Sequence, residues 1–360
     1  AKNGAHRRVA LGMVHLFGGH SNQRIVFGFM VSAALLSMWI SNTATTLMLL
    51  PVALATLEGA KNRELRVPLL LGICYAASVG GMGTPIGTPP NLIFMKVYTE
   101  NTGIALTFLD WMRWGLPVVI CFIPLIGWWL TRKMAVEQDI EIPSMGRWQQ
   151  AEVRVLVVFA LTALAWITRK EPFGGWSGLL ALPDANDATV ALIAVILMFI
   201  IPDGRGGRLL DWESANKIPW GMLLLFGGGI AIAKAFKSAG LSEALATQLV
   251  GLSALPVILL LLCVCLAVTF MTEMTSNTAT TTLLMPILAA AAVATEIDPA
   301  LLMVPAAMSA SCAFMLPVAT APNAIIFGSG EVSIREMAKR GFAINLIGAV
   351  VISSICYLVI

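Results

Sequence analysis

The run SNTATT occurs twice in this chain, at residues 41–46 and again at residues 276–281. Each copy lies near the middle of a long apolar segment, 25–57 in the first case and 255–295 in the second. A polar backbone at membrane depth is tolerated only where it is buried in protein or lines a wet cavity. The repeated run therefore predicts two helical hairpins with polar tips inside a membrane protein.

Composition supports a membrane protein independently of the repeat. The chain has 360 residues, of which 58% are hydrophobic and 12% are charged, with a net charge of +3. A soluble domain carries roughly 25% charged residues, so a soluble enzyme and a disordered chain are both excluded. The low charge also argues against nucleic acid as a partner, and the six cysteines lie in apolar stretches without a disulfide pattern. We expect an all-α polytopic protein in the lipid bilayer.

Apolar segments recur along the whole chain. They cover 25–57, 68–97, 114–130, 153–167, 188–201, 220–236, 255–295, 301–327 and 341–360. One helical span needs about 20 apolar residues. The two segments that carry SNTATT are too long for one span and too short for two, so each is predicted to be a re-entrant hairpin broken at its polar run.

Two further spans carry prolines in their middle. Residues 83–91 read GTPIGTPPN within the segment 68–97, and residues 316–323 read LPVATAPN within 301–327; their ends, GTPPN at 87–91 and ATAPN at 319–323, match each other. Proline removes a backbone donor and clashes with the preceding turn, so these spans are predicted to be unwound at mid-membrane. Each broken span follows its hairpin tip at nearly the same spacing, which makes hairpin plus broken helix an internal repeat.

The number of crossings predicts how the two repeats are oriented. Five segments lie between the hairpins, and an odd number of crossings makes the hairpins enter from opposite faces, as an inverted repeat. Placing the N-terminal end in the cytoplasm puts most of the 23 Lys and Arg residues on the cytoplasmic side of the cell membrane, as the positive-inside rule requires. Inverted repeats with broken helices indicate a secondary transporter whose site lies near the midplane.

The chemistry of the predicted breaks favours an anion and a cation together. N-termini of half-helices present free N–H groups and the positive ends of helix dipoles, which suit an anionic substrate. Unwound carbonyls and helix C-termini suit a hard cation such as Na⁺. Neither SNTATT run has Lys or Arg beside it. The anion is therefore expected to be held by dipoles, hydrogen bonds and Na⁺.

Glu273 is the acidic residue that lies deep in a hairpin arm, and its counterpart in the first copy is Met38. A charge inside the membrane is a functional hypothesis by default. Three interpretations stay open from the sequence. Glu273 tunes a cation site, carries a proton, or only hydrogen-bonds the end of a broken helix.

These motifs resemble those of the divalent-anion/sodium symporters, which include sodium-coupled di- and tricarboxylate transporters. The resemblance is carried by SNT at 41–43, SNT at 276–278, GTPPN at 87–91 and TAPN at 320–323, and it spans nearly the whole chain. It departs from the family at Ala321, where many members have proline. The resemblance implies an elevator-type homodimer that transports a dicarboxylate. It also implies about three further spans before Ala1.

The resemblance further implies two Na⁺ sites and one substrate site. The first Na⁺ site would use Ser37, Ser41, Asn42 and Gly87, and the second Thr272, Thr275, Ser276, Asn277 and Ala319. Substrate carboxylates would contact Asn42, Thr43, Thr88, Asn277, Thr278 and Thr320. Coupled uptake of a C4 dicarboxylate (succinate, malate or fumarate) is the leading hypothesis. The alternatives are Na⁺-independent dicarboxylate exchange, citrate or sulfate symport, and an anion channel. The sequence has no recognisable set of catalytic residues for an intramembrane enzyme.

The expected organisation has five parts. They are an interfacial start at 1–24, a first transport repeat at 25–113, scaffold-type and connecting helices at 114–254, a second transport repeat at 255–327, and a last transmembrane helix at 328–360.

Overall fold

The computed structural model describes residues 8–9, 12, 21–59, 63–134, 148–171, 174–216 and 255–360, and scattered residues between 220 and 244. Most of the predicted interfacial start at 1–24 and of the predicted span 220–236 therefore lies outside the described residues. Within the described ranges every regular element is a helix, and the one strand-like contact is an isolated bridge between Pro202 and Arg208.

Several of these helices are long and apolar enough to cross a bilayer. Those of at least 18 residues are Arg66–Gly83 (α4 with the short η2), α6 (Phe108–Thr131), α7 (Gln150–Ile167), α14 (Asn277–Ala294) and α17 (Ile334–Val359). Shorter apolar helices are α9 (Asp187–Ile200), α13 (Val257–Thr272) and α15 (Pro299–Ser309). The predicted all-α polytopic membrane protein is confirmed.

Each region predicted to be a hairpin contains two successive helices with a short break between them. The first consists of α2 (Asn22–Ser37) and α3 (Asn42–Gly59), and the second of α13 and α14, with 16 and 18 residues in the two arms of each. At 1.5 Å per residue the arms measure about 24 and 27 Å, which is longer than the half-length helices expected from the sequence.

The break in each hairpin covers residues 38–41 and 273–276, so it ends at the first serine of the polar run. Ser41 accepts a hydrogen bond from the amide of Ala44, and Ser276 accepts one from the amide of Ala279. A serine in this position caps the next helix. The residues from Asn42 and from Asn277 onward therefore form the first turn of the second arm, which corrects the predicted position of the break.

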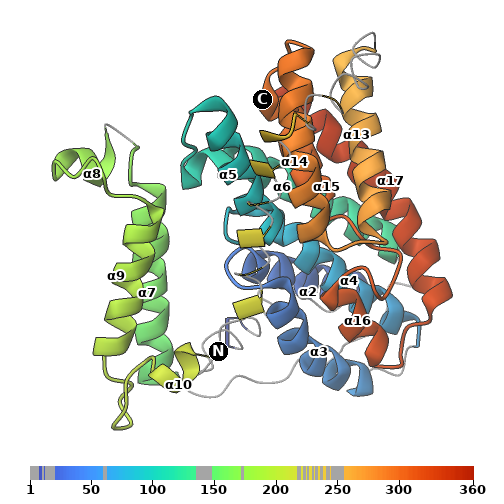
Figure 1. Ribbon diagram of the computed structural model, residues 1–360. Coiled ribbons are helices and arrows are strands. Elements are labelled where there is room, and N and C mark those ends of the chain that lie inside the picture. Colours follow the sequence, from blue (N-terminus) through green and yellow to red (C-terminus); the bar gives the residue numbers. More distant parts are fainter. Residues whose placement is uncertain are drawn as a thin grey trace.

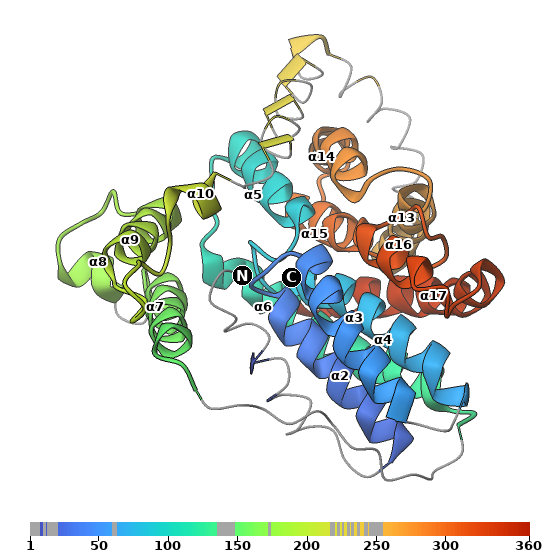
Figure 2. The same ribbon diagram turned by 90° about the horizontal axis from the view of Figure 1, so that it is seen from below.

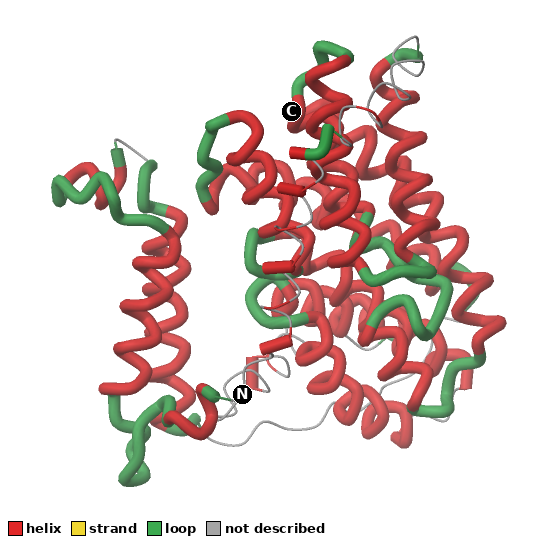
Figure 3. Tube along the Cα trace, viewed as in Figure 1, coloured by secondary structure: helices red, strands yellow, loops and turns green. Residues whose placement is uncertain are grey.

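Both predicted broken spans are interrupted. α4 (Arg66–Gly80) and η2 (Gly81–Gly83) precede α5 (Pro89–Thr102), and α15 precedes α16 (Ala321–Gly328). Figure 3 shows the connecting loops in green between the red helices. Pro85 and Pro317 lie inside the breaks, as the sequence predicted, whereas Pro89, Pro90 and Pro322 occupy the first two positions of α5 and α16. Proline suits the start of a helix, where its missing N–H has no intrahelical partner to lose.

The two repeats pack in matching pairs. α2 lies on α4 as α13 lies on α15, and α6 covers the first group as α17 covers the second. The two groups also pack against each other, because α14 contacts α5 and α16 contacts α3. These helices form one bundle, seen from two directions in Figures 1 and 2. The predicted boundary between residues 113 and 114 falls inside α6, which packs with the bundle.

A smaller unit lies beside this bundle in Figure 1. It contains α7 and α9, which pack on each other, with the short helices α8 (Gly175–Leu179) and α10 (Trp212–Ala215). Aromatic rings connect α7 to the bundle. Phe159 lies edge-on to Trp39 at the first hairpin tip, and Trp166 stacks on Phe108 at the start of α6, with centroid distances of 5.1 and 5.0 Å.

Candidate functional site

The first hairpin tip joins three predicted cation ligands. The hydroxyl of Ser37 donates to Oδ1 of Asn42 over 2.6 Å. A Cβ built on Gly81 would lie 2.7 Å from Oδ1 of Asn42 and 3.2 Å from the carbonyl oxygen of Gly87. The backbone of η2 at Gly81 therefore lies so close to the Asn42 side chain that a larger residue at position 81 would displace that side chain. Ser37, Asn42 and Gly87 gather around one point.

The second tip repeats the first contact at the equivalent positions. The hydroxyl of Thr272 lies 2.9 Å from Oδ1 of Asn277 and 2.9 Å from the carbonyl oxygen of Ala310. Ala319 is buried, and its amide donates to Leu316 over 3.2 Å as Gly87 donates to Thr84 over 3.3 Å. The two breaks thus contain the same turn, although their sequences differ.

The other predicted cation ligands use their hydroxyls within their own hairpins. Ser41 and Ser276 cap α3 and α14. Thr275 bonds the carbonyl oxygen of Met271 over 3.0 Å, and its hydroxyl lies 2.5 Å from that of Thr280. The carbonyl oxygens of Ser41 and Ser276 also accept helix hydrogen bonds, from the amides of Thr45 and Thr280 over 3.0 and 2.9 Å.

Two asparagines that the sequence analysis did not assign hold the breaks closed. Nδ2 of Asn91 donates to Gly81 over 2.9 Å and to Thr84 over 2.7 Å. Nδ2 of Asn323 makes the equivalent bonds to Ala313 over 2.8 Å and to Leu316 over 3.0 Å. Each amide thus ties both sides of an unwound stretch together. The signal was present in the sequence, because both asparagines end the repeated PN motif.

Glu273 occupies the second break as a buried acceptor. Its Oε1 accepts from the amides of Phe314 and Met315 over 2.7 and 2.8 Å, and its Oε2 accepts from the amide of Leu316 over 3.1 Å. Nδ2 of Asn345 on α17 also donates to Oε1, over 2.7 Å. The carboxylate therefore satisfies three successive amides that have no helical partner. Of the three interpretations left open, the hydrogen-bonding one is observed.

The first break is held differently at the equivalent place. Met38 packs its side chain against Gly83, where a Cβ would lie 2.9 Å from the Met38 methyl group. The hydroxyl of Thr84 donates to the carbonyl oxygen of Met38. A thioether and a backbone carbonyl thus replace the carboxylate, so the two halves share a backbone shape and differ in local charge.

All six predicted substrate contacts lie at helix N-termini. Thr88 and Thr320 are the N-caps of α5 and α16, while the other four occupy the first two positions of α3 and α14, namely Asn42, Thr43, Asn277 and Thr278. The hydroxyl of Thr320 caps its helix over 3.3 Å, whereas that of Thr88 makes no capping bond. The six residues therefore lie at the positive dipole ends of four helices, α3, α5, α14 and α16.

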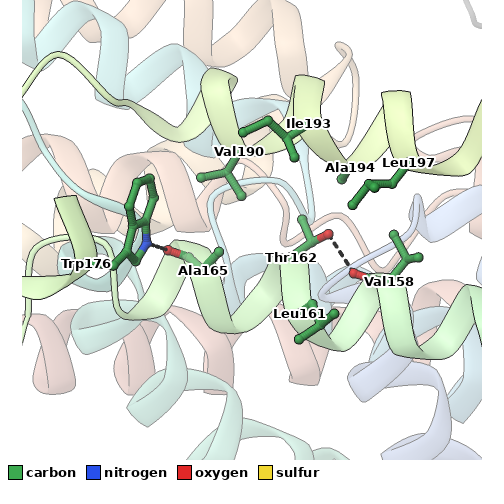
Figure 4. A pocket seen from close by; sticks show the side chains of 9 residues that line it. All are labelled: Val158, Leu161, Thr162, Ala165, Trp176, Val190, Ile193, Ala194 and Leu197. Carbon is green, nitrogen blue, oxygen red and sulfur yellow. Dashed lines mark hydrogen bonds between the residues drawn. The ribbon is translucent and has the colours of Figure 1, made fainter. Parts of the chain in front are cut away.

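A separate cavity of about 300 Å³ lies between α7 and α9 (Figure 4). Its lining is apolar apart from Thr162 and Trp176. The Thr162 hydroxyl donates to Val158 over 2.7 Å, and the indole N–H of Trp176 donates to Ala165 over 2.8 Å. With both donors occupied, this cavity offers nothing to hold an anion.

Comparison with known proteins agrees with the geometry. Residues 1–359 match the model of the sodium:sulfate symporter transmembrane region. The chain is 40% identical over 380 residues to sodium-dependent dicarboxylate transporters of Staphylococcus aureus strains USA300 and NCTC 8325 / PS 47. It is also 40% identical over 378 residues to the transporter of the same description in strain MRSA252. Each match covers 98% of this chain and 72% of the relative.

Proposed function

This chain belongs to the sodium:sulfate symporter family, as the motifs predicted, and from that membership we propose that it couples Na⁺ to the transport of C4 dicarboxylates. It is a transporter of the divalent-anion/sodium symporter class and a multi-pass membrane protein. The observation that carries the proposal is the repeated bond of Ser37 to Asn42 and of Thr272 to Asn277.

The proposed substrate site lies between the two hairpin tips. Its donors are the N-terminal amides and side chains of α3, α14, α5 and α16. Contacts between the repeats support this placement, because the second arm of each hairpin packs on a half-helix of the other repeat. Dipoles and neutral donors hold a dicarboxylate without a fixed cation, which keeps its release easy.

The residues at the tips fit Na⁺ as the co-substrate. A hydroxyl, a side-chain amide oxygen and backbone carbonyls are the hard oxygen ligands that such a cation prefers. Ser37, Asn42 and Gly87 would hold one ion with the carbonyl of Ser41, and Thr272, Asn277 and Ala319 would hold a second with carbonyls of Thr275 and Ser276. Bound Na⁺ supplies positive charge beside the substrate carboxylates.

The mechanism we propose is an elevator motion in a homodimer of the cell membrane. The inverted repeat would move as a unit past a scaffold, with the N-terminal end of this chain in the cytoplasm. Long-range ion pairs support the predicted sidedness. Arg66 at the start of α4 pairs with Glu331 shortly before α17, and Arg113 on α6 pairs with Glu171 shortly after α7. Each pair joins segments that the crossing count places on the same side.

Uptake by the full-length protein in liposomes tests this function. Labelled succinate should accumulate only with an inward Na⁺ gradient, and Asn42→Ala or Asn277→Ala should abolish accumulation in folded protein. Uptake that persists when choline replaces Na⁺ would favour dicarboxylate exchange. Flux that does not saturate would favour a channel.

The substrate class needs its own measurement. Unlabelled succinate, malate, citrate, sulfate and aspartate are each added in competition with labelled succinate. We expect the C4 dicarboxylates succinate and malate to compete best. Stronger competition by citrate or sulfate would reassign the substrate within the family.

A further inference from the structure

A basic cavity of about 600 Å³ lies away from the hairpin tips, where the start of α4, the end of α6 and the start of α17 meet. It is lined by Glu64, Val67, Pro68, Trp129, Leu130, Arg132, Lys133, Met134, Glu336, Lys339 and Arg340. Four cations and two carboxylates face one space of a size that holds a small ligand. Neither the transport motifs nor the family match accounts for it.

The two arginines are fixed at the end of α6. The guanidinium of Arg132 lies 3.3 Å from the centre of the Trp129 ring and donates to the Trp129 carbonyl oxygen. Nη1 of Arg340 lies 3.4 Å from the carbonyl oxygen of Leu130. Basic groups commonly bind the last carbonyls of a helix, so the arginines alone have a structural explanation.

The two lysines have no such explanation. Lys133 and Lys339 are exposed, and neither makes an ion pair with a residue that the structure describes. Their ammonium groups add two positive charges to a space that already holds two guanidinium groups. Like charges this close repel one another, so binding of an anion among them is favoured.

The carboxylates of the cavity do not balance these charges. Oε2 of Glu336 accepts from the hydroxyl of Ser333 over 2.7 Å and from its amide over 3.2 Å, so it serves the capping box of α17. Glu64 also interacts with another group of the protein. Two carboxylates against four cations leave the lining of the cavity with a net positive charge.

Apolar helix faces lead from the bilayer to this cavity. On α6, exposed Leu125 and Trp128 lie on the face that ends in Arg132. On α17, exposed Phe342 and Leu346 continue the face that begins with Lys339. Tryptophan and basic residues at the end of an apolar helix mark the level of the lipid headgroups.

We propose that this cavity binds the phosphate of an anionic phospholipid headgroup, with the acyl chains along the exposed faces of α6 and α17. Arg132 and Arg340 form the fixed wall, and Lys133 and Lys339 close over the phosphate as mobile arms. Basic pockets between membrane helices recognise lipid headgroups in this way. The cavity is separate from the proposed transport site, so the proposal of lipid binding does not depend on the proposed transport function.

The test is lipid binding to the purified full chain in detergent, measured by native mass spectrometry with phosphatidylglycerol as the probe. We expect Lys133→Gln/Lys339→Gln to weaken binding by about tenfold or more. The matched control Lys96→Gln/Lys170→Gln removes two exposed lysines outside the cavity and should bind as the wild type does. Glu336→Gln should strengthen binding, because it removes a negative charge from the lining.

Further arms identify the ligand. Phosphatidylcholine and diacylglycerol should bind much less than phosphatidylglycerol, and inorganic phosphate should not displace the lipid. Equal loss in both double variants, or equal binding of the uncharged lipid, would overturn the proposal. Displacement by inorganic phosphate at a concentration similar to that of the lipid would reassign the cavity to a soluble anion.

Discussion

Oε1 of Glu273 lies 2.7 Å from the amide nitrogen of Phe314, so a carboxylate on one hairpin binds a backbone amide in the break of the following span. Glu273 is the C-cap residue of α13, and the neighbouring Thr272 contacts Asn277 and Ala310. The second break and the second tip are therefore fixed together.

Replacing Glu273 by glutamine should destabilise this half selectively. Glutamine keeps the shape but places an N–H₂ group against amides that need an acceptor, and an unmet buried group costs about 1–3 kcal/mol. We expect a lower unfolding temperature in detergent and weaker Na⁺ activation of uptake. Glu296→Gln, at an exposed position of the same repeat, is the control. Unchanged unfolding and Na⁺ dependence in Glu273→Gln would show that the carboxylate is dispensable.

Replacing Asn91 by alanine should open the first break. The change leaves the carbonyl oxygens of Gly81 and Thr84 without their side-chain donor, and we expect about 2–4 kcal/mol of lost stability. Asn323→Ala should behave alike, because its two bonds are equivalent. Thermal unfolding and succinate uptake measure both effects. Asn101→Ala serves as the comparison, since Asn101 bonds a carbonyl within an intact helix. A similar loss of stability in Asn101→Ala would show that the bonds of Asn91 and Asn323 across the breaks have no special role.

Removing the Ser37 hydroxyl should weaken the first cation site. Ser37→Ala deletes the group that bonds Asn42, and we expect the Na⁺ concentration for half-maximal uptake to rise about tenfold, with little change in unfolding temperature. Ser32→Ala removes another buried hydroxyl of α2, one that donates to Gly28 within the helix. If both variants shift Na⁺ activation equally, Ser37 is not a ligand.

Shortening Phe159 should change the speed of transport more than its affinity. The ring lies against Trp39 at the first hairpin tip, on the contact between α7 and the bundle. An elevator motion would have to break or slide this contact. We expect Phe159→Ala to alter the maximal uptake rate at least about twofold, with the succinate concentration for half-maximal uptake unchanged. Leu164→Ala, at an exposed position of α7, should leave the rate as it is. A change confined to affinity would argue against a moving contact.

Much of the fold could be predicted from the sequence. The repeated SNTATT run located both hairpins, and the GTPPN and ATAPN runs located both broken spans. The breaks of the two spans overlap the predicted stretches, but the break in each hairpin lies a few residues before its predicted position, because the motif residues readily start a helix. Serine caps the second arm, and proline fits the first turn of the following half-helix.

The candidate site was only partly foreseen. Ser37 and Asn42 are brought together as expected, and so are Thr272 and Asn277. Gly81 was missed, because its importance arises from the close approach of the Asn42 side chain, which is distant in sequence.

The sequence by itself determined that the chain is a helical membrane protein with two copies of one motif, because hydropathy and repetition are properties of the chain alone. Only the tertiary structure decided how each copy is held. Asn91 and Asn323 clamp both breaks in the same way, while Glu273 binds free amides where Met38 packs against glycine. Unwound backbone must find partners for its polar groups inside the bilayer, and those partners come from segments that only folding brings into contact.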